Sequence, residues 1–145
     1  MSWEEAFAAR YDEWAAGAIY ADDVAIVAAG ITVPEALKAA DALAEESVEA
    51  RVVDLYSIKP IDEETLRSLS MPIVTVEDHL PEGGLGEAVL SALADVEERP
   101  RVVKLAVREL PRSGKPAELL HAAEIDADAI VAAARRLVEV ETLSA

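Results

Sequence analysis

The sequence VAIVAAG at residues 24–30 decides the fold class. It is a short apolar run that closes on a glycine, which predicts a strand buried on both faces. Strands of this kind belong to parallel sheets, whose two faces are covered by helices. The next segment agrees, because Pro34 stands at the first turn of a stretch whose apolar residues recur at three- and four-residue steps.

The alternation of strand and helix continues along the chain. Further strands are predicted at residues 50–56, 72–77 and 101–107, and helices at 62–69, 85–96 and 126–141, with short helical pieces near 116–123. Asp62 and Asp126 are expected to cap two of these helices. The pattern predicts a three-layer α/β/α sandwich around a mainly parallel or mixed sheet of about five strands.

The length of 145 residues predicts one compact unit with one core. Ahead of it, apolar residues between Trp3 and Ala15 recur at helical spacing and predict an amphipathic helix. The composition shifts between Gly17 and Asp23. We therefore expect an N-terminal helical segment or linker over residues 1–21 and an α/β domain over residues 22–145.

The composition excludes several classes of function. A net charge of −16 repels phosphate backbones and anionic lipids, so neither a nucleic acid nor a membrane is an expected partner. The absence of cysteine excludes disulfides and thiolate metal sites. The apolar runs are too short to span a bilayer, and the N-terminus has no signal-peptide pattern. A soluble cytoplasmic protein is expected.

Candidate binding residues follow the third predicted strand, because ligands of open α/β sheets lie outside the carboxyl ends of the strands. Gly83, Gly84 and Gly86 lead into a helix whose first N–H groups could hold an anion, with His79 as a further donor. Lys59 could place a cation near the same edge. The alternative is structural: the glycines permit a tight turn and close helix–sheet packing, and His79 caps a loop.

Taken in order, these segments resemble the transketolase C-terminal domain. The resemblance spans about residues 22–138, and its segments are 24–30, 34–36, 51–55, 58–62, 74–79, 83–89, 113–114, 116–120 and 125–127. The turn at 58–62 most resembles that of the short, split transketolases. Two features depart from the family: Ala122-Ala123-Glu124 replaces a frequent Tyr-Gly pair, and the N-terminal segment has no clear counterpart.

The resemblance implies a domain or subunit of a transketolase, an enzyme of the pentose phosphate pathway that transfers ketol groups between sugar phosphates. Such a domain supports dimer assembly and is inactive alone. Thiamine diphosphate and a divalent metal are expected in companion domains, since the family motif that holds them begins Gly-Asp-Gly and ends in Asn, and this sequence has neither. The expected partners are the N-terminal thiamine-binding domains or subunit and a second copy, in a homodimer. No catalytic, cofactor-binding or metal-binding residue is predicted in this chain.

Two alternatives stay open at this point. The same domain closes the β subunit of 2-oxoacid dehydrogenase E1 components and 1-deoxyxylulose-5-phosphate synthase, where it would act as a partner-docking module. The chain could also be an independent α/β domain that binds small anions through His79 and residues 83–86.

Overall fold

The computed structural model describes residues 22–145 and confirms the α/β class. Its four strands are β1 (Val24–Ala28), β2 (Ala50–Asp54), β3 (Ile73–Val76) and β4 (Val102–Leu105). They lie in the order β2-β1-β3-β4, and every neighbouring pair is parallel. Within the described residues the sheet therefore has four strands instead of about five, and these are the four segments that the sequence named. The helix predicted near the N-terminus lies outside the described residues.

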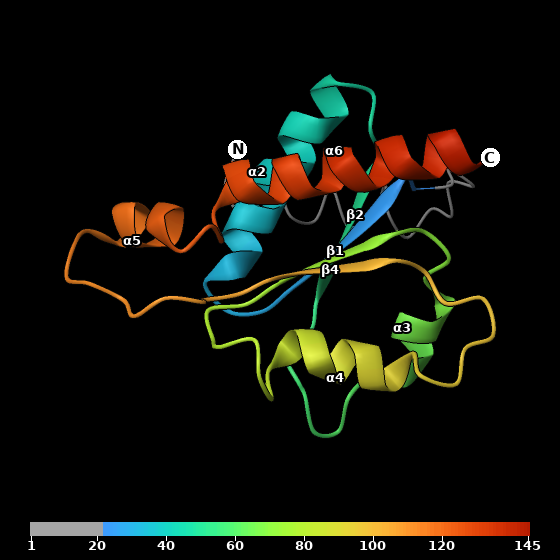
Figure 1. Ribbon diagram of the computed structural model, residues 1–145, viewed down its shortest axis with the longest axis horizontal. Helices are drawn as coiled ribbons and strands as arrows, with labels where there is room; N and C mark the ends of the chain where they lie inside the picture. The colour runs from blue at the N-terminus through green and yellow to red at the C-terminus, as the bar shows by residue number, and fades with distance from the viewer. Residues whose placement is uncertain (1–21) are drawn as a thin grey trace, which may run out of the picture.

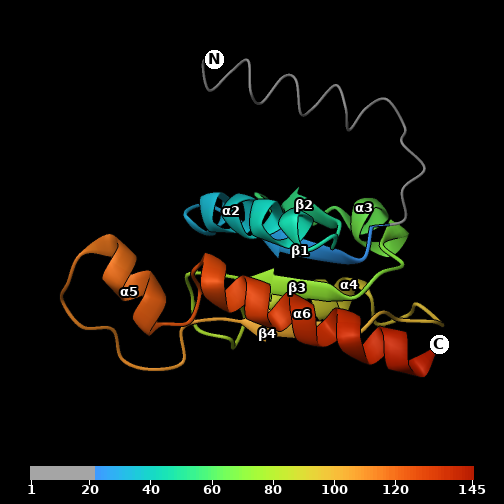
Figure 2. The same ribbon diagram turned by 90° about the horizontal axis from the view of Figure 1, so that it is seen from above.

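Helices cover both faces of the sheet, as Figures 1 and 2 show. They are α2 (Thr32–Glu45), α3 (Glu63–Ser68), α4 (Leu85–Ala92), α5 (Pro116–Ala122) and α6 (Ala127–Ser144). Helices α2 and α6 pack on one face, and α3 and α4 on the other. The three predicted layers are therefore present, and α5 stands apart from them.

The core is divided by the sheet into two apolar clusters. All five residues of β1 are buried, as its unbroken apolar run predicts. Ile26 and Leu43 belong to the cluster under α2 and α6, and Leu66 and Val89 to the cluster under α3 and α4. Full burial of such a side chain contributes about 1.5–3 kcal/mol. The alternation of side chains along β1 thus ties both layers to one strand.

Two carboxylates fix the start of α6. Asp126 accepts a hydrogen bond from the backbone N–H of Ala129 at 3.0 Å, which confirms its predicted capping role. Glu35 of α2 accepts one from the N–H of Ala127 at 2.9 Å. Asp62 caps α3 in the same way, through the N–H of Thr65 at 3.0 Å.

The start of α2 is held by a buried hydroxyl. Thr32 is the first helical residue, and the N-cap residue Ile31 makes no side-chain capping bond. The Thr32 hydroxyl is fully buried and lies within hydrogen-bond distance of the carbonyls of Ala29, at 2.8 Å, and Val76, at 3.1 Å. It therefore joins the carboxyl ends of β1 and β3, where buried polar groups need partners.

The turn after α5 places a non-glycine residue in the left-handed region. Glu124 has φ 56°, and the N–H of Ile125 donates to the carbonyl of Leu120 at 3.1 Å. This is the geometry in which a helix usually ends on glycine. At residues 122–124, where the sequence departs from the family, the chain therefore makes this turn without a glycine.

We predict that Glu124→Gly raises the free energy of unfolding by about 1 kcal/mol, because glycine adopts this φ without the Cβ clash. Chemical denaturation followed by circular dichroism measures the change. As a control, Ala122→Gly, in the last turn of the same helix, should lower stability. Equal or reversed effects of the two substitutions would contradict the assignment.

Candidate functional site

The carboxyl edge of the sheet carries every loop that the sequence singled out. The four loops follow β1, β2, β3 and β4 at residues 29–31, 55–62, 77–84 and 106–115. Because the strands are parallel, all four loops leave the same edge, from which α5 projects in Figure 1. Ligands of open α/β sheets bind at this edge, so it is the candidate location of a site.

A buried carboxylate occupies the start of α4. Glu77 directly follows β3 and is 4% exposed. Its Oε1 accepts a hydrogen bond from the N–H of Leu85 at 2.9 Å, and its Oε2 accepts one from the N–H of Gly86 at 2.7 Å. A negative charge at a helix N-terminus is favourable, and hydrogen bonds to a charged acceptor are strong. The anion at the N-terminus of α4 is therefore a side chain of the protein itself.

The three glycines of this loop each have a structural reason. A Cβ on Gly84 would lie 1.8 Å from Oε1 of Glu77, and one on Gly86 would lie 2.7 Å from Cδ of Lys104 in β4. Gly83 has φ 70°, and its N–H donates to Oε2 of Glu87 at 2.7 Å. The glycines make room for the carboxylate, for close packing of helix and sheet, and for the turn.

His79 lies beside this carboxylate on the solvent side. Its Nδ1 is 2.6 Å from the carbonyl oxygen of Leu80, to which it donates, and 3.7 Å from Oε1 of Glu77. The imidazole is 58% exposed. The backbone carbonyl of His79 also accepts a hydrogen bond from the N–H of Val107, which ties the loop to the chain after β4. The structure thus brings His79 and the glycines together around Glu77.

Lys59 lies apart from this group. It is exposed in the loop after β2, and β1 separates β2 from β3. Within residues 22–145 no hydrogen bond or ion pair joins Lys59 to His79 or to the glycine loop. An external anion at Leu85 and Gly86 would have to displace Glu77. The anion or regulatory site at these residues stays a prediction.

The structure contains a cavity beside β2 that the sequence did not predict. Its volume is about 400 Å³. It is lined by Val53, Asp54, Leu55, Tyr56, Ser57, Pro60, Ile61, Asp62, Thr65 and Leu66. The residues come from one continuous stretch, the end of β2, the following loop and α3. In the sequence, the cavity is indicated only by the turn residues of that loop. The same residues are explained equally well as the end of a strand.

A second group forms where α5 meets α6. His121 Nδ1 lies 2.6 Å from Oδ2 of Asp126, and ligand atoms of His121, Asp126 and Asp128 all lie within 4.8 Å of one another. The hydrogen bond to Asp126 and the charge of that carboxylate raise the pKa of His121 above its ordinary value of 6.5. These three side chains do not enclose a metal site. His121 and Asp128 are exposed, and Asp126 already accepts the capping hydrogen bond of α6. The contact between His121 and Asp126 joins the end of α5 to the start of α6.

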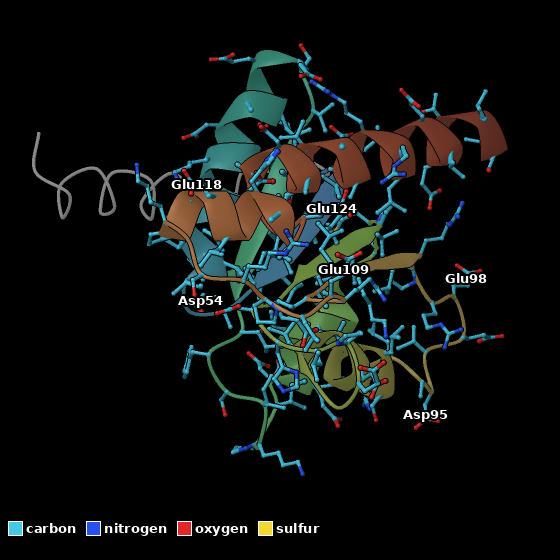
Figure 3. The ribbon with its side chains drawn as sticks, turned by 60° about the vertical axis from the view of Figure 1, so that its left-hand side comes forward. Asp54, Asp95, Glu98, Glu109, Glu118 and Glu124 are labelled. Carbon is cyan, nitrogen blue, oxygen red and sulfur yellow. The ribbon has the colours of Figure 1, made fainter. Side chains whose placement is uncertain are left out.

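Acidic side chains are distributed over the surface of the described residues. Figure 3 labels six of the acids, and they lie spread over several elements of the described chain. This arrangement agrees with a solvated surface charge. None of the described helices is long and apolar enough to cross a bilayer.

Glu77→Gln should lower the free energy of unfolding by about 1–3 kcal/mol, because an amide presents one acceptor where the carboxylate presents two to Leu85 and Gly86. Urea denaturation at neutral pH measures the loss. Glu82→Gln, an exposed acid of the same loop, is the control and should change stability by less than about 0.5 kcal/mol. An unchanged Glu77→Gln protein would contradict the role of the carboxylate.

For His121 we expect a pKa above 6.5 in an NMR titration and a fall toward 6.5 in Asp126→Asn, which keeps a capping oxygen but loses the charge. Since the folded pKa is raised, the stability from this pair is complete below the unfolded pKa. It is lost as the pH rises through the folded pKa. The charge of Asp128 contributes less, so Asp128→Asn should lower the pKa of His121 by a smaller amount. A larger fall in Asp128→Asn than in Asp126→Asn would be inconsistent with the contact.

Comparison with known proteins gives a consistent result. Residues 19–130 match the family model described as "Transketolase, C-terminal domain". Transketolase of Rattus norvegicus is 49% identical over 121 residues, and that of Homo sapiens 48%; each match covers 81% of this chain and 19% of the relative. These relatives favour a transketolase over the E1 β subunit and synthase alternatives.

A solved structure described as "Split gene transketolase, inactive beta4 tetramer" superposes with a TM-score of 0.75 at 40% identity, covering 83% of this chain and 40% of that chain. A transketolase mutant from Pichia stipitis, at 23% identity and a TM-score of 0.60, shares the fold and covers 81% of this chain and 16% of that chain. The chain spans about a fifth of the length of its curated relatives. It belongs to the transketolase family, within which it is a C-terminal domain.

Proposed function

We propose that this chain is the C-terminal part of a transketolase, that it supports assembly of the enzyme, and that it is inactive alone. In the complete enzyme, a companion part would carry the transfer of ketol groups between sugar phosphates. The observation that carries the proposal is the match of residues 19–130 to the transketolase C-terminal domain. The buried Glu77 carboxylate at the start of α4 supports the expected inactivity of the chain alone. It fills, with the protein's own charge, the helix N-terminus that a phosphate-bearing ligand would need.

Within the described residues, the start of α4 does not fit the diphosphate of thiamine diphosphate. A diphosphate placed at Leu85 and Gly86 would meet the Glu77 carboxylate, whose negative charge repels it and whose oxygens already take both N–H groups. The sequence also contains no Asn and no Gly-Asp-Gly. We therefore place the cofactor in the companion part, where it supplies the chemistry of ketol transfer.

The proposed partners are of two kinds. One is the thiamine-binding part of the same enzyme, present as preceding domains or as a separate subunit. The other is a second copy of this chain, because the similar split-gene transketolase is described as an "inactive beta4 tetramer". A polypeptide that self-associates without catalysis agrees with a role in assembly. A cytoplasmic location and a place in the pentose phosphate pathway complete the proposal.

Reconstitution tests this function. The companion part from the same genome and this chain are purified separately, and ketol transfer between two sugar phosphates is assayed with each alone and with both. We expect activity only, or at least about tenfold more activity, when both are present. Calorimetry with thiamine diphosphate and magnesium should give heat with the companion and none with this chain. Turnover or cofactor binding by this chain alone would overturn the proposal.

A further inference from the structure

The negative charge of this domain lies on its surface and exceeds what its own bases can neutralise. Residues 22–145 contain 25 Asp and Glu side chains and 12 Lys and Arg side chains, and among these acids only Glu77 is buried. Four ion pairs between Lys or Arg and a carboxylate join residues of this stretch. Like charges held on a compact surface repel each other, which opposes folding. The remaining charge therefore has to be balanced by the solvent.

The ends of the longer helices add a second electrostatic cost. The C-terminus of a helix carries a partial negative charge, so a base stabilises it and an acid destabilises it. Of the helices in the described chain, the three longest, α2, α4 and α6, have no base in their last turn. In contrast, α3 has Arg67 in its last turn and its acids in its first turn. The arrangement in α2, α4 and α6 is unfavourable at low ionic strength.

Acidic residues stand at or just beyond these three helix ends. Glu45 is the exposed last residue of α2, and it lies one turn after Asp41, so it meets a like charge as well as the negative end of the helix. Glu141 is exposed in the last turn of α6. Asp95 and Glu98 follow the end of α4 and point away from the ribbon in Figure 3.

The range of these repulsions decides how much salt relieves them. Side chains one helical turn apart have Cβ atoms about 5–6 Å from each other. The screening length of a monovalent salt is about 10 Å at 0.1 M and about 3 Å at 1 M. Neighbouring acids therefore repel each other in dilute buffer and are screened from each other only as the salt approaches molar concentration.

We propose that the fold of this domain depends on dissolved salt: the domain is stable where monovalent cations are present at about molar concentration and loses stability steeply as they are diluted. The cations act by screening the acidic surface and the acidic ends of α2, α4 and α6, without a coordinating site. K⁺ and Na⁺ are equivalent in this role, because screening depends on charge and concentration. This dependence is separate from the function proposed above.

Urea unfolding of the purified chain, followed by circular dichroism, is the first test, because urea is uncharged and leaves the ionic strength unchanged. Between about 0.05 M and about 1 M KCl, the ratio of folded to unfolded protein extrapolated to zero urea should rise by at least about tenfold. NaCl should give the same curve. A ratio that is unchanged or falls with salt, or that responds to only one of the two cations, would overturn the proposal.

A matched pair of variants tests the helix ends. Glu45→Lys and Glu64→Lys make the same substitution at exposed helical positions, and each changes the net charge from −16 to −14. Glu64 lies in the first turn of α3, where an acid is favourable. At about 0.05 M KCl the folded-to-unfolded ratio of Glu45→Lys should exceed that of Glu64→Lys by at least about threefold, and the two should converge at about 1 M. Equal ratios in dilute salt, or a difference that persists at high salt, would contradict the role of the helix ends.

The double variant Glu45→Lys/Glu141→Lys separates screening from a general effect of salt on apolar burial, which does not depend on these charges. Screening predicts that the double variant gains less stability from KCl than the wild-type chain does. An unchanged salt dependence would mean that the salt acts through burial and would overturn the proposal. All of these measurements use this chain alone, so their outcome is independent of whether the companion part restores ketol transfer.

Discussion

The carboxylate of Glu77 at the start of α4 is the interaction on which the carboxyl edge of this domain depends. One buried side chain at the end of β3 takes two backbone donors of the following helix, so strand, loop and helix become one unit. Gly84 must lack a Cβ because the carboxylate occupies that space. Buried charge is tolerated here because it is paired with hydrogen-bond donors and with the positive end of the helix.

This internal anion also supports the role that we propose for the edge. In many open α/β sheets the helix N-terminus after a strand receives a ligand's phosphate. In this domain the same position is filled during folding, and His79 on the solvent side donates to its own loop. The rest of the edge presents exposed apolar side chains and an uncovered helix. Those features suit contact with protein better than contact with a small charged metabolite.

The sequence predicted much of this architecture because the signals are local. An unbroken apolar run is compatible with a central parallel strand, which is why β1 was predicted correctly. Asp62 and Asp126 were predicted as helix caps because a cap is a contact within three residues. Glu77 was missed: its donors lie eight and nine residues away, and a carboxylate after a strand looks like any surface acid. The four segments predicted as strands all form strands, so the estimate of about five exceeds by one the number within the described residues.

By itself, the sequence determined the class of fold, the layering of helices on a parallel sheet and the family, since apolar periodicity and the order of motifs are properties of the chain in one dimension. Only the tertiary structure decided what the candidate residues do. It placed a carboxylate in the predicted anion site and separated Lys59 from His79 by an intervening strand. It also left α5 without a buried residue and formed a largely apolar cavity beside β2. These relations depend on strand order and side-chain direction, which bring together residues that are distant in the sequence.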